Sequence, residues 1–319
     1  MTQSSVLEAS PPLAVDPARE VPALPRYLMG VALLVGVLGI LMSMTALLIN
    51  SPMENLGEWM LSYGVRNWIS HLLMVGLGVY WLTQAYLERN GLGNYQRPAG
   101  LLIAYGLVCL GLSWLCGYAI SYLFLWSHEQ LSNVMLTNLL WWALELLRFV
   151  IETLLPLWLL LHLFRHTAVK VSDPLKMPGQ TMAWCFALGV VVAYLQLCAL
   201  AMSLISSMLY SSAVAGWEGW IVLGHGVLYL LVAFFAARGA LPEQVMGFKG
   251  GRLALACLIT LLLWIASAVA CAALMLVLLL KGGRDEAAPL ILLGVLHLAL
   301  LWPFTRLGLR WGYRAQAVA

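Results

Sequence analysis

The sequence predicts an all-α integral membrane protein with eight transmembrane helices in two similar four-helix halves. Of its 319 residues, 62% are hydrophobic and 10% are charged, whereas soluble domains are typically about 45–50% apolar and about 25% charged. Eight stretches are long and apolar enough to cross a hydrocarbon core of about 30 Å. Most basic residues fall in connections on one side of these stretches. The composition therefore excludes a soluble enzyme, a DNA-binding protein and a disordered chain.

The predicted helices follow one another with short connections, and each contains about 20 or more mostly apolar residues. They span residues 27–49, 67–87, 98–125, 138–164, 181–209, 219–237, 253–280 and 288–305. Residues 1–26 contain five prolines and no apolar periodicity, so we predict a flexible cytoplasmic tail there.

The basic residues predict the orientation of the helices, because loops rich in Lys and Arg stay in the cytoplasm. With the N-terminus inside, 13 of the 17 basic residues are cytoplasmic, three (Arg66, Lys281 and Arg284) are external, and Arg148 lies within a helix. We therefore predict a multi-pass protein of a bacterial-type inner (plasma) membrane, with both termini cytoplasmic and the lipid bilayer as its main partner.

The first external connection predicts a short amphipathic segment over residues 51–66. Its apolar residues, from Met53 to Tyr63, recur at spacings of three and four, while Glu54 and Glu58 fall on the opposite face. Such a segment is a connector or a lid over the outer surface.

An internal repeat divides the predicted bundle into residues 27–165 and 181–319, joined by a cytoplasmic linker at 166–180. Corresponding residues are His71 and His225 at an offset of 154, Trp114 and Trp264 at an offset of 150, and Pro156 and Pro303. Halves with an even number of helices enter the membrane in the same direction. Small residues in helices 181–209 and 253–280, such as Ala266 and Ala268, permit close packing of the backbones.

The fourth helix carries three charged residues within the predicted membrane. Glu145, Arg148 and Glu152 are spaced by three and four residues, so they share one helical face. A rise of about 1.5 Å per residue puts Glu152 about 16 Å deep. Pro156 has no N–H to donate to the Glu152 carbonyl. Intramembrane charges cost about 2.5–3.5 kcal/mol each on insertion scales and mark functional sites.

We interpret this face as a binding site for a proton, a cation or a polar solute, with Gln196 of the fifth helix as a further polar group. The structural alternative is that Arg148 bridges both carboxylates and locks the bundle. Burial also favours a protonated carboxyl group, so a proton-exchanging Glu152 is a further possibility.

Histidines support a second hypothesis, because neutral imidazole ligates haem iron or metal. His71, His225 and His297 lie within the second, sixth and eighth predicted helices. This layout is similar in outline to haem A synthase, which implies a haem-binding redox protein. The Glu-x-x-His-Arg run expected of that family is absent, since the chain has NWISHLL and IVLGHGV there. We therefore do not assign the chain to the family.

Enzymatic motifs are absent: the chain has no Walker A, GxSxG or HExxH sequence. No cluster of basic residues with interleaved aromatics indicates nucleic-acid binding. The leading hypothesis is a non-enzymatic membrane protein, without a cofactor, that binds or moves a small polar solute or ion past helix four. The alternatives are the haem protein and an accessory or immunity-type protein that acts by binding another membrane protein.

Overall fold

The structure is a computed structural model that describes residues 22–50, 64–130, 133–171, 176–209, 217–281 and 287–313. Its α-helices are α1 (Leu24–Asn50), α3 (Val65–Arg89), α4 (Pro98–Gln130), α5 (Val134–Phe149), α6 (Leu155–Leu163), α7 (Gly179–Leu209), α8 (Trp217–Arg238), α9 (Gly250–Lys281) and α10 (Ala287–Gly312). A π-helical turn, η3 (Val150–Leu154), joins α5 to α6, and a 3₁₀ turn, η4 (Phe164–Thr167), follows α6.

Each of the eight predicted apolar stretches is helical, and the fourth is the continuous segment that runs from α5 through η3 and α6 into η4. Most of the predicted amphipathic segment, residues 51–63, lies outside the described residues. The all-helical character of the bundle is therefore confirmed.

Six helices in the described part of the chain are long and apolar enough to cross a membrane. They contain the spans Leu24–Thr45, Pro98–Ile120, Met135–Thr167, Gly179–Ala201, Gly250–Leu278 and Ile291–Gly312. Helix α8 contributes a shorter apolar stretch, Val222–Arg238. Helix α3 carries more polar residues than the others, among them Ser70, His71 and Gln84. The structure is thus that of a helical membrane protein, and eight crossings remain a prediction.

The outer faces of the long helices are apolar and uncovered. Leu107 of α4 and Leu262 of α9 are 65% and 57% exposed. Large apolar side chains left in water lose about 1.5–3 kcal/mol each relative to burial. Lipid tails remove that cost, so these faces fit a bilayer.

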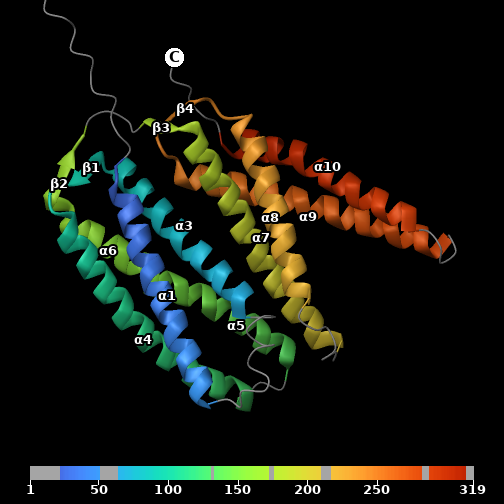
Figure 1. The fold of residues 1–319 in the computed structure, drawn as a ribbon, viewed down its shortest axis with the longest axis horizontal. Helices are drawn as coiled ribbons and strands as arrows, with labels where there is room; N and C mark the ends of the chain where they lie inside the picture. The colour runs from blue at the N-terminus through green and yellow to red at the C-terminus, as the bar shows by residue number, and fades with distance from the viewer. Residues whose placement is uncertain are drawn as a thin grey trace, which may run out of the picture.

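The buried apolar residues form two clusters that follow the predicted halves. The first cluster joins α1, α3, α4 and α6 with β1 (Leu92–Tyr95). The second joins α7, α8, α9 and α10 and includes Tyr80 of α3. Figure 1 shows the helices of the first half on one side and α7–α10 on the other. The repeat relation between the halves stays a prediction.

Two short antiparallel strand pairs connect the halves to their linker. Strand β1 pairs with β2 (Ala168–Lys170), and β3 (Lys176–Pro178) pairs with β4 (Gln244–Met246). The predicted linker thus contributes one strand to each half. All four strands lie at the end of the bundle where α1 begins and α10 ends (Figure 1).

The strand pair of the first half is fixed to helix α6 by a buried tyrosine. The Tyr95 hydroxyl donates to the Leu161 carbonyl at 3.0 Å. Burial raises the pKa of Tyr95 above its ordinary value, so the hydroxyl keeps its proton and remains a donor. Gly91, with φ of 59°, supplies the turn between α3 and β1, because side chains rarely adopt positive φ.

Helices α9 and α10 pack closely through glycines of α10. A Cβ at Gly308 would lie 2.9 Å from the backbone N and Cα of Thr260, and one at Gly312 would overlap Ala256. Gly308 and Gly312 form a G-x-x-x-G pattern, which lets membrane helices approach closely. The alanines that we expected to serve this purpose, such as Ala266, are instead exposed. The close contact requires glycine facing a small residue, and only the register of α10 on α9 decides where that occurs.

Replacing Gly308 with leucine will destabilise the protein, because the side chain must displace the Thr260 backbone. We expect a loss of about 1–3 kcal/mol, typical of overpacking, visible as a lower melting temperature in detergent. Gly294→Leu on the same helix is the control, since a Cβ at Gly294 meets no atom within 4 Å. Equal melting temperatures of the two variants would contradict the contact.

Candidate functional site: a polar cavity in the first half

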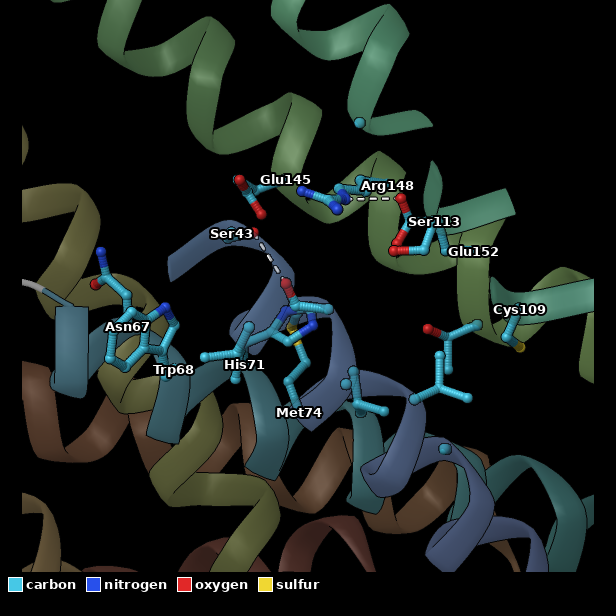
Figure 2. A pocket seen from close by; sticks show the side chains of 18 of the residues that line it. Ser43, Asn67, Trp68, His71, Met74, Cys109, Ser113, Glu145, Arg148 and Glu152 are labelled. Atoms are coloured by element: carbon cyan, nitrogen blue, oxygen red, sulfur yellow. Dashed lines mark hydrogen bonds and ion pairs between the residues drawn. The ribbon is translucent and has the colours of Figure 1, made fainter. Parts of the chain in front are cut away.

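A cavity of about 880 Å³ lies where α1, α3, α4, α5–η3 and α7 meet. Its polar lining includes the charged groups of Glu145, Arg148 and Glu152 together with His71 and Gln196. Five elements far apart in the sequence therefore place the predicted polar residues around one space. The close-up in Figure 2 shows the charged side chains above the helix that carries His71.

The helix that supplies the charges is interrupted beside them. Pro156 follows the π-helical turn of η3, in which the Leu155 N–H donates to the Val150 carbonyl five residues back. Proline has no N–H and its ring clashes with the carbonyl of residue i−4, here Glu152, and a wider turn relieves that clash. Glu152 and Thr153 are buried within this turn. Turns of this kind often occur at functional sites.

The π turn also exposes backbone to a neighbouring helix. The Tyr105 hydroxyl of α4 donates to the Thr153 carbonyl at 3.4 Å. The sequence predicts an unpaired carbonyl at Glu152, and this stays a prediction. Pro303, the corresponding proline, lies within α10 and is accommodated without a π turn. The break of the fourth helix is thus specific to the first half.

Arg148 and Glu152 form an ion pair inside the bundle. The Arg148 Nε donates to Glu152 Oε1 at 2.7 Å, and the two side chains are 28% and 10% exposed. The Ser113 hydroxyl of α4 lies beside the same carboxylate (Figure 2). Charge-assisted hydrogen bonds of this length are about twice as strong as neutral ones. Glu152 is therefore held in one position by its own helix and by α4.

Glu145 lines the same cavity without an ion pair. The ion pair at this cavity joins Arg148 to Glu152 and does not include Glu145. Glu145 is exposed on the cavity side of α5, one turn before Arg148 (Figure 2). With both glutamates and Arg148 ionised, the three groups carry a formal charge of −1. That excess charge is located at Glu145.

Gln196 connects α7 to α3 at the wall of the cavity. Its Nε2 donates to Ser70 Oγ at 3.2 Å and approaches Met74 Sδ at 3.8 Å. Both partners line the cavity, as does His71 one residue after Ser70. The amide therefore fixes the second half against the first beside the site.

His297 lies in the second half, within an ordered chain of hydrogen bonds. Tyr229 Oη lies 2.9 Å from His297 Nε2, and Ser267 Oγ lies 2.9 Å from His297 Nδ1. Ser267 itself donates to the Trp264 carbonyl at 2.9 Å. Because this bond uses the serine proton, a neutral His297 ring donates from Nδ1–H to Ser267 and accepts at Nε2 from Tyr229. The chain joins α8, α9 and α10.

The three histidines of the haem hypothesis are not brought together. His225 lies near Tyr229 on α8, with ring centroids 6.3 Å apart, whereas His71 lines the cavity of the first half. Both ring nitrogens of His297 already have protein partners. No group of three His, Cys, Asp or Glu side chains in the described ranges is arranged to hold a metal ion.

The sequence did not single out the α4 residues of the cavity. Tyr105, Ser113, Trp114 and Tyr118 line it from a helix without charged residues in its membrane span. Their spacing offers one signal: Ser113 and Trp114 are each followed four residues later by another lining residue, Gly117 and Tyr118. The helix as a whole has no amphipathic periodicity, so this spacing stands out only once the cavity is known.

Comparison of the chain with protein families, curated proteins and solved structures found no match.

Replacing Arg148 with methionine will strongly destabilise the protein, because it leaves the buried Glu152 carboxylate without its partner. Breaking a buried pair from one side costs about 3–5 kcal/mol. The double variant Arg148→Met, Glu152→Gln removes both charges and should recover much of this loss. The measurement is the melting temperature in detergent. A double variant that melts no higher than Arg148→Met would show that the pair does not stabilise the bundle.

Proposed function

We propose that this membrane protein binds a small polar solute or ion in the cavity of the first half and serves to carry or sense it. The observation that carries the proposal is the convergence of Glu145, Arg148 and Glu152 on one cavity of about 880 Å³. Ligand sites typically measure about 300–1,000 Å³ and combine an apolar lining with a few polar groups. Charges within a membrane protein are retained where they act on a ligand.

The pairing of the charges favours a binding site over a purely structural lock. A lock would use Arg148 to bridge both carboxylates. Arg148 instead pairs with Glu152, and Glu145 faces the cavity without an ion-pair partner among the described residues. A carboxylate kept apart from the nearest arginine is available to a ligand.

The predicted orientation assigns the cavity to the outer part of the membrane. Its lining comes from the later part of α1, the first turns of α3 and the later part of α4. With both termini cytoplasmic, these are the external portions of the helices. We propose that the solute enters from outside an inner (plasma) membrane, and that the two four-helix halves move relative to each other at the Gln196 contact.

A variant that fills the cavity tests the proposal before the solute has been identified. Gly117 lines the cavity, and a Cβ there meets no atom within 4 Å, so Gly117→Leu starts in open space and adds bulk at the cavity wall. Gly111→Leu is the matched control, because Gly111 has equal space on the same helix but lies outside the cavity.

We expect at least one compound in a panel of alkali and alkaline-earth ions, amines, amino acids, carboxylates and sugars to raise the melting temperature. A ligand at 100 times its Kd stabilises the protein by about 2.7 kcal/mol. The shift should persist in Gly111→Leu and disappear in Gly117→Leu. The proposal fails if no compound shifts the wild type, or if both variants respond alike.

A further inference from the structure

We propose that the solute is a small organic monocation, of which a quaternary ammonium compound is the simplest example. This inference rests on the proposed function and names the chemical class that the same cavity accepts. Three properties of the cavity carry it: the location of the excess charge, the aromatic lining, and the size.

The charged groups of the cavity leave one negative charge at Glu145 that a monovalent cation would compensate. Arg148 and Glu152 neutralise each other at 2.7 Å. The remaining carboxylate lines the cavity with no ion pair in the described part of the chain. A monovalent cation beside Glu145 brings the three groups to neutrality, whereas an anion places a second uncompensated negative charge beside the first.

Aromatic rings form much of the remaining lining. Trp68 from α3, Trp142 from α5, and Trp114 and Tyr118 from α4 all border the cavity. The rings of Trp114 and Tyr118 lie 5.9 Å apart at an angle of 50°, and these residues are 66% and 73% exposed. Aromatic rings attract cations through their quadrupoles, and quaternary ammonium groups are bound by aromatic surroundings.

The size of the cavity distinguishes an organic cation from a bare metal ion. Calcium needs six to eight oxygen ligands at 2.3–2.6 Å, and magnesium needs six at about 2.0–2.1 Å. The cavity is about 880 Å³, and its wall combines carboxylates with rings and apolar groups rather than a close shell of oxygens. A methylated ammonium group needs no such shell, since it is weakly hydrated and fills space against rings.

A zwitterion is disfavoured by the state of Arg148. Its carboxylate would require a cationic partner, but the charge of Arg148 is already matched by Glu152. Binding of a zwitterion would therefore leave the excess charge of the cavity in place. Choline and glycine betaine test this difference directly, because they share a trimethylammonium group and differ in the added carboxylate.

The experiment is a tryptophan-fluorescence titration of the full-length protein in detergent with choline, glycine betaine and sodium chloride, at constant ionic strength. Trp68, Trp114 and Trp142 report on the cavity. We expect a saturable response to choline and at least tenfold weaker responses to betaine and sodium.

Variants of glutamate locate the binding. Glu145→Gln should weaken choline binding at least tenfold, and Glu145→Asp, which keeps the charge, should restore part of it. Glu243→Gln is the matched control, because Glu243 is exposed beyond α8 and lies outside the cavity. The affinity of this variant for choline should stay within twofold of that of the wild type.

Three results would overturn the inference: no saturable response to choline, betaine binding as tight as choline, or equal affinities in Glu145→Gln and the wild type. Suppose that another compound class stabilises the wild type and that Gly117→Leu removes this stabilisation. The binding cavity is then supported, and only the assignment of its ligand as an organic cation is wrong. If no compound class stabilises the wild type, both fail together.

Discussion

The ion pair between Arg148 and Glu152 is the interaction on which the arrangement of the first half depends. A charged arginine and a carboxylate are costly in an apolar bundle unless each has a partner. Their 2.7 Å contact supplies that partner along one helix, at the turn that Pro156 widens. Because Arg148 and Glu152 pair along one helix, with Ser113 of α4 as a further contact, the other neighbouring helices need not close on the pair. They leave a cavity, with Glu145 facing it.

Polar contacts between helices determine how the surrounding elements are held around that cavity. Tyr105 binds the backbone of the π turn from α4, and Gln196 binds Ser70 from α7. In the second half, the chain from Tyr229 through His297 to Ser267 joins three helices in the same manner. The two halves thus use their polar residues differently: the first surrounds an open space, and the second uses a histidine to connect helices.

The strands explain how a chain of membrane helices keeps its two halves together at one end. The linker between them donates one strand to a loop of each half, at the end where α1 begins and α10 ends (Figure 1). The apolar clusters of the halves meet where α3 and Met29 of α1 pack against the second cluster. The interface between the halves therefore combines apolar packing of α3, such as Tyr80 and Trp81, with the polar contact of Gln196 beside the cavity.

The sequence by itself determined the membrane class, the eight helical stretches and the shared face of Glu145, Arg148 and Glu152. These follow from local physics: long apolar runs must form helices in lipid, and residues three and four apart lie on one side of a helix. Tertiary structure alone decided that Arg148 selects Glu152 over Glu145, that Ser113 and the α4 aromatics join the site, and that His71 is separated from His297. It also decided that Gly308 and Gly312 of α10 pack against Thr260 and Ala256 of α9, whereas Ala266 stays exposed. Apolar periodicity does not specify which faces of different helices meet, since lipid and protein interiors are equally apolar. That choice depends on side-chain shape and on the few polar partners available.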